Sequence, residues 1–120
     1  MQIIPASIED AVEDLLAFYG QQLLEKAGQM SEGDFVAFAH PEAGRFVRDS
    51  WALWWRPGHN HPQWPEEVPP IVRFFQERGI SSPDDMSTII LTSVYRTVRK
   101  VPVDLEGQIL ACLQYWKGKN

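Results

Sequence analysis

RFVRDSWALWW, the stretch from Arg45 to Trp55, holds three of the chain's five tryptophans and two of its arginines. Spacings of three and four residues place its apolar side chains on one stripe of a helix. We therefore expect Trp51 and Trp54 to lie in the core and Trp55 to be the partly exposed tryptophan. This stretch predicts a central helix against which neighbouring helices pack.

Helical patterns continue on the N-terminal side of this stretch. A capping serine at Ser7 opens an apolar pattern that predicts a helix to about Lys26. A second capping pattern at Ser31 opens a short helix, which Pro41 should end or kink. The next helix is expected to begin near Pro41 or Glu42, because proline is tolerated in a first helical turn.

The C-terminal side contains a proline-rich loop and three more helical patterns. The loop, about residues 56–70, holds five of the nine prolines. A small hairpin within it remains an alternative to irregular structure. Helices are then expected over about residues 69–78, from the Ser82 cap to about Arg99, and after Asp104. The inward face of the last helix is predicted to contain Leu105, Ile109, Cys112, Leu113 and Trp116.

These patterns predict an all-α fold: a compact bundle of five or six helices forming a single domain over residues 1–120. A chain of 120 residues buries roughly two thirds of its unfolded surface, so a hydrophobic core needs no disulfide or metal. The single cysteine, Cys112, is expected to be a buried apolar residue.

Charge is distributed unevenly along the chain. The segment through Glu42 carries eight carboxylates and one basic residue, whereas the remainder holds ten basic and eight acidic residues. An acidic surface disfavours nucleic acid as a partner and favours a basic protein. With no secretory signal and no apolar run long enough for a membrane span, we expect a cytoplasmic protein that does not enter a membrane.

Three segments resemble a bacterial family that is a domain of unknown function: SIEDAVEDLL (Ser7 to Leu16), RDSWALW (Arg48 to Trp54) and SPDDMSTIIL (Ser82 to Leu91). The resemblance extends from residue 7 to about residue 99. Its motifs are Arg-x-x-x-x-Leu-Trp and Pro-Asp-Asp-x-Ser. The family often has histidine where this chain has Ser82, and an asparagine-like residue where it has Asp49.

The resemblance implies the fold and no activity, but it singles out Arg48, Asp84 and Asp85. A guanidinium group can hold a carboxylate across two distant elements. We therefore expect a structural brace from Arg48 to the two aspartates.

No catalytic residues are predicted and no cofactor is expected. Asp84 and Asp85 are adjacent, so on a helix they point about 100° apart and do not form a carboxylate pair. His59 and His61 are weak metal-ligand candidates, with third ligands open among His40, Glu66 and Glu67; two solvated loop histidines are the favoured explanation.

The function expected from the sequence is protein interaction without catalysis. An immunity or antitoxin-like protein would bind a basic partner through the acidic N-terminal helix. The candidate binding residues are Glu9, Asp10, Glu13, Asp14, Arg45, Trp55, Arg56 and Trp64. An alternative remains open, namely a small enzyme or ligand-binding domain with a tryptophan-lined pocket over Arg48, Asp84 and Asp85.

Overall fold

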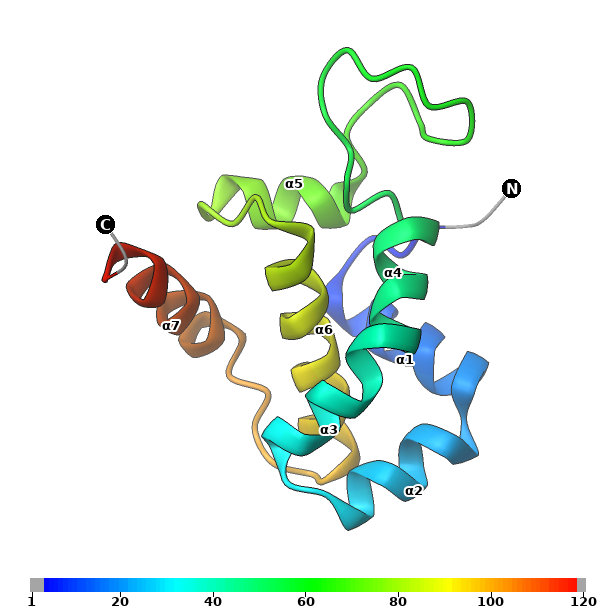
Figure 1. Ribbon diagram of the computed structural model, residues 1–120, viewed down its shortest axis with the longest axis vertical. Coiled ribbons are helices and arrows are strands. Elements are labelled where there is room, and N and C mark those ends of the chain that lie inside the picture. The colour runs from blue at the N-terminus through cyan, green and yellow to red at the C-terminus, as the bar shows by residue number, and fades with distance from the viewer. Residues whose placement is uncertain (1–3, 119–120) are drawn as a thin grey trace.

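The computed structural model describes residues 4–118, and in this part of the chain it contains helices and no strands (Figure 1). The all-α prediction is therefore confirmed. The proline-rich loop, for which a small hairpin was an alternative, forms turns. The elements are α1 (Ile8–Tyr19), α2 (Gln21–Gln29), α3 (Glu32–Ala39), the π-helix η1 (His40–Gly44), α4 (Arg45–Ser50), α5 (Pro70–Glu77), α6 (Pro83–Val98) and α7 (Leu105–Lys117).

Helix α6 lies at the centre of the fold and contacts α1, α2, α3, α4, η1 and α7. Ser82 caps it, since its Oγ accepts a hydrogen bond from the Asp85 backbone N–H, and Pro83 occupies the first turn. Ten of the residues from Pro83 to Tyr95 are buried. A helix with apolar residues on nearly all sides is stable only when other helices surround it.

The helix expected from Ser7 to Lys26 is divided into α1 and α2 at Gly20. Gly20 has a φ of 43°, a left-handed conformation that residues with a Cβ rarely adopt. The apolar spacing continues from one helix into the other, because Leu15 and Leu23 are both buried. The break therefore changes the direction of the chain without removing either helix from the core.

Pro41 does not end the helix that precedes it. Helices α3, η1 and α4 follow one another with helical backbone angles at each junction. Proline has no N–H and clashes with the carbonyl of the preceding turn in an α-helix, and the wider π turn at η1 accommodates both defects. One bent helical segment thus replaces the two helices expected from the sequence.

The prediction for the three central tryptophans was correct for Trp51 and wrong for the other two. Trp51 is 1% exposed, whereas Trp54 is 43% exposed and Trp55 only 8%. The cause is that α4 ends at Ser50 and Ala52 takes a φ of 57°, so the helical spacing stops before Trp54. Trp55 then turns inward and Trp54 outward.

Helix α7 packs less deeply than the sequence predicted. Ile109 is buried and Cys112 is half-buried, but Leu113 and Trp116 are exposed. Among the other helices α7 contacts α6 above all, and it lies at the edge of the fold (Figure 1). A helix with one packing partner buries only a narrow stripe.

Candidate functional site

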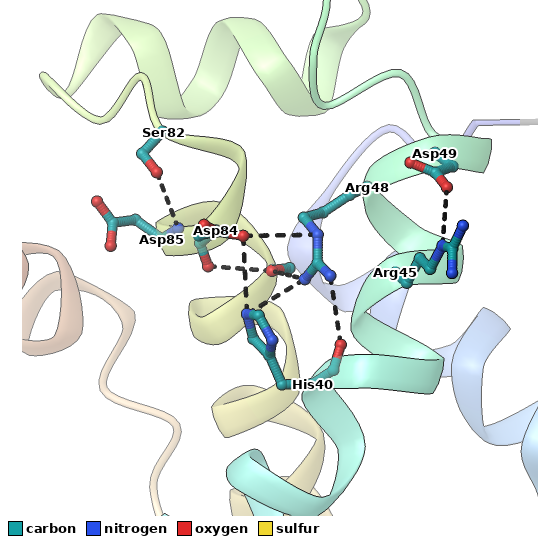
Figure 2. A network of polar contacts seen from close by, with 8 residues as sticks. His40, Arg45, Arg48, Asp49, Ser82, Asp84 and Asp85 are labelled. Atoms are coloured by element: carbon teal, nitrogen blue, oxygen red, sulfur yellow. Dashed lines mark hydrogen bonds and ion pairs between the residues drawn. The ribbon is translucent and has the colours of Figure 1, made fainter.

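Polar side chains from η1, α4 and α6 converge around Arg48, whose side chain is buried in the middle of the group (Figure 2). Arg48 Nη1 donates to Ser87 Oγ over 3.0 Å, and Nη2 donates to the His40 carbonyl over 3.4 Å. Arg48 Nε lies 3.6 Å from Asp84 Oδ1. The guanidinium group therefore joins the bent η1–α4 segment to the first turns of α6.

His40 completes this network. Its Nε2 lies 3.2 Å from Arg48 Nη1 and 3.8 Å from Asp84 Oδ1. Because a guanidinium group only donates, His40 Nε2 is the acceptor of this hydrogen bond. His40 thus gives the Arg48 guanidinium group a further hydrogen-bond acceptor, on η1.

Asp85 lies outside the Arg48 network, although the sequence grouped it with Asp84. Its Oδ2 accepts a hydrogen bond of 2.7 Å from Trp116 Nε1. Burial raises the pKa of the Cys112 thiol to about 11, assisted by the charge of Asp85 and by a hydrogen bond to it. Asp84 and Asp85 thus connect the start of α6 to different parts of the molecule.

A hollow of about 240 Å³ lies where Asp85 meets α7. Its walls include Ile80, Cys112, Leu113 and the indole of Trp116. A much smaller hollow lies between α2 and η1, at Tyr19 and Phe38. Neither is lined by the tryptophans expected to form a pocket, Trp51, Trp55 and Trp64.

The two candidate metal ligands of the proline-rich loop make contacts within the loop. His59 Nε2 lies 2.9 Å from the Pro65 carbonyl, and His59 Nδ1 accepts from the His61 backbone N–H. The His61 ring stacks on Trp64 at 4.4 Å. Within residues 4–118, no three His, Cys, Asp or Glu side chains gather in a way that could hold a metal ion.

The other candidate binding residues around the central stretch do not share one exposed surface. Trp55 is buried, and its Nε1 donates to the Pro65 carbonyl over 2.9 Å. Arg56 is exposed, but its guanidinium group donates to the Trp54 and Trp55 carbonyls. Arg45 is exposed and pairs with Asp49 of the same helix (Figure 2).

The acidic residues of α1 form an exposed face. Glu9, Asp10, Glu13 and Asp14 are all exposed, while the opposite side of the helix is buried against α6. None of these four carboxylates takes part in an ion pair within residues 4–118. At the end of the same face, Phe18 is 66% exposed.

Residues 4–98 match a family model described as a domain of unknown function, DUF6794. The chain belongs to this family. The DUF6794 match covers α1 to α6, and with them the acidic face and the Arg48 network; α7 lies beyond it. No curated protein and no solved structure matches the chain. No helix in the described part of this DUF6794 chain is long and apolar enough to cross a bilayer.

The sequence did not indicate the contacts that three residues make in these sites: His40, Ser87 and Trp116. His40 was considered only as a third metal ligand, because its contact with Arg48 depends on the π turn at η1. Ser87 faces Arg48 one turn after Asp84, a spacing that places both on one side of α6. Trp116 was predicted on the inward face of its helix, but no pattern indicated its contact with Asp85, which depends on how α7 packs.

Proposed function

We propose that this DUF6794 protein is a non-enzymatic interaction domain that binds a basic protein through the exposed face of α1. In this proposal it acts in the cytoplasm of a bacterium as an immunity or antitoxin-like protein. The observation that supports the proposal is the set of four exposed carboxylates on α1, none paired within residues 4–118.

The contrast with other carboxylates of the chain strengthens this reading. Glu32 receives two hydrogen bonds from Arg96, and Asp84 and Asp49 each have an arginine within 4 Å. The α1 carboxylates therefore form a field of one sign directed at the solvent. Such a field accelerates encounter with a positively charged partner and disfavours acidic ones.

Charge steers association, whereas aromatic side chains supply much of the binding energy at interfaces. Phe18 continues the acidic face, and its ring packs at a tilt against the partly buried Phe46 ring, with centroids 4.8 Å apart. An acidic field that ends in an exposed phenylalanine suits a partner with a basic rim and an apolar centre. Occlusion of a basic cleft on that partner is the proposed mechanism of neutralisation.

The alternative, a small enzyme or ligand-binding domain with a tryptophan-lined pocket over Arg48, gains no support from the geometry. Trp51 is fully buried in the core, and Arg48 is enclosed by His40, Ser87 and Asp84. Trp64 lies in the loop, stacked on His61. Neither of the two hollows described above is lined by these residues.

Affinity capture from a lysate of the organism that carries the gene tests the proposal. The bait is the full chain, and the test variant neutralises the acidic face by E9Q, D10N, E13Q and D14N. The control variant makes the same charge change at exposed carboxylates elsewhere, by E66Q, E67Q, E77Q and E106Q. We expect wild type and control, but not the test variant, to retain a stoichiometric basic protein at low salt.

Retention should fall at moderate salt, because contacts between exposed charges are screened. The F18S variant should release the partner faster without changing the dependence on salt. Recovery of no stoichiometric partner, or equal recovery with both neutralised variants, contradicts the proposal.

A further inference from the structure

The hollow beside α7 combines an apolar wall with a carboxylate. Ile80 and Leu113 supply aliphatic surface, Trp116 supplies an aromatic ring, and Asp85 supplies the charge. In Figure 1, α7 and α1 lie on opposite sides of α6, so this hollow is separate from the acidic face.

Asp85 is the unbalanced charge in this hollow. The donors that contact it, Trp116 Nε1 and the Cys112 thiol, are uncharged, and within residues 4–118 it has no ion pair. Arg78 directly precedes Gly79, the first residue that lines the hollow. Its guanidinium group stacks on the Phe74 ring and donates to the Phe74 carbonyl, so it does not pair with Asp85. A partly buried carboxylate held by neutral donors favours a cation as its further partner.

The volume limits what can enter. A hollow of about 240 Å³ equals the space of about eight water molecules in the liquid, at roughly 30 Å³ each. This is below the range of pockets that enclose drug-sized ligands or cofactors. A linear group of five to seven heavy atoms fits, which is the size of a short amine or of a lysine side chain.

We propose that this hollow binds an alkylammonium group, with its nitrogen on the Asp85 carboxylate and its alkyl stem between Ile80 and Leu113. The stem replaces water along the aliphatic wall, where burial is favourable. The Trp116 indole supplies further apolar surface along this wall. The same chemistry is available from a small free amine and from a lysine side chain of another protein.

The experiment uses the indole N–H resonance of Trp116 in ¹H–¹⁵N spectra of the full chain, assigned by its loss in W116F. n-Butylammonium chloride is titrated against wild type at neutral pH and low ionic strength, and 1-butanol is the neutral ligand of the same length. We expect a saturable shift with the ammonium and a response at least tenfold weaker with the alcohol.

Two variants assign the charge to one carboxylate. D85N should weaken n-butylammonium binding at least tenfold. D34N is the matched control, because Asp34 occupies the corresponding position after the Ser31 cap of α3 and accepts the same loss of charge. D34N should bind as wild type does.

Nα-acetyl-lysine methylamide distinguishes the two sources. Binding of both ligands shows that a lysine side chain can enter, and binding of n-butylammonium alone assigns the hollow to free amines; both results support the proposal. The absence of a saturable shift in wild type overturns it, as does an equal response to 1-butanol. These two outcomes are read on wild type alone, so they hold even if D85N fails to fold.

Discussion

Arg48 of α4 donates a hydrogen bond of 3.0 Å to Ser87 of α6, and both side chains are buried. The two residues are 39 positions apart in the chain. Asp84, by contrast, is 65% exposed, so water weakens its attraction to Arg48. The buried hydrogen bonds, more than the ion pair, make Arg48 the connection between the bent helical segment and α6.

The first prediction follows from this difference. R48M should lower the free energy of unfolding by about 2–4 kcal/mol, because it leaves the polar groups of Ser87 and His40 without their donor. D84N should lower the free energy of unfolding by less than about 1 kcal/mol, because the ion pair that it removes lies on the solvent-exposed side of Arg48. Urea unfolding measures both.

R45M is the control for R48M, because Arg45 lies in the same helix and its pair with Asp49 is exposed. Its effect should stay within about 0.5 kcal/mol. Equal losses for R45M and R48M would contradict the role assigned to the buried hydrogen bonds.

Gly44 gives a second prediction. A Cβ added at this position would lie 2.9 Å from Arg48 Nη1 and 3.4 Å from Leu91 Cδ1. G44A should therefore destabilise the fold by about 1–2 kcal/mol, although alanine favours a helix by up to about 1 kcal/mol over glycine. The midpoint of urea unfolding should shift downward.

Gly28 provides the opposite case for the same substitution. It lies in α2, and a Cβ there would meet nothing within 4 Å. G28A should raise the midpoint, as expected from helix propensity alone. If G44A also raises it, Arg48 does not require the space that Gly44 leaves.

The sequence predicted the elements that depend on local chemistry. Ser7, Ser31, Ser82 and Asp104 do cap helices, since each side chain accepts a hydrogen bond from a backbone N–H three residues later. Such caps involve neighbours in the chain, so they can be read without knowing the fold.

The sequence failed where backbone geometry or packing decided the outcome. Trp54 is exposed and Trp55 is buried, the reverse of the prediction, because Ala52 adopts a left-handed conformation. An alanine in the sequence does not indicate such a conformation. Likewise, the contact between Asp85 and Trp116 depends on the approach of α7 to α6. The family resemblance, together with opposite charge, indicated Arg48 and Asp84 as neighbours, but the π turn that adds His40 had no local signature beyond Pro41.

A third prediction concerns the proline-rich loop. Trp55 Nε1 and His59 Nε2 both contact the Pro65 carbonyl, so this tryptophan ties the end of the loop to its beginning. W55F removes the indole donor and should increase hydrogen exchange and proteolysis over residues 56–68. W54F should leave both unchanged, because Trp54 is exposed. Equal protection of the loop in W55F and wild type would show that the stacked rings hold it without the hydrogen bond.

The last prediction uses Cys112. Burial first, and then the charge and hydrogen bond of Asp85, raise the pKa of its thiol from 9.0 to about 11. Alkylation requires the thiolate, so at pH 8 the folded chain should react with iodoacetamide about 100-fold more slowly than the urea-unfolded chain. The rate should rise steeply with pH and reach half its maximum near pH 11.

The sign of the effect on stability follows from the same shift. A thiol whose pKa is raised by folding stabilises the folded chain below its unfolded pKa, and this contribution is lost as the pH rises from 9.0 towards about 11. D85N removes the charge but leaves the burial, so alkylation at pH 8 should accelerate without reaching the unfolded rate. D34N should react as wild type does. A half-maximal rate near pH 9 in folded wild type would show that burial and Asp85 do not raise the pKa of the Cys112 thiol.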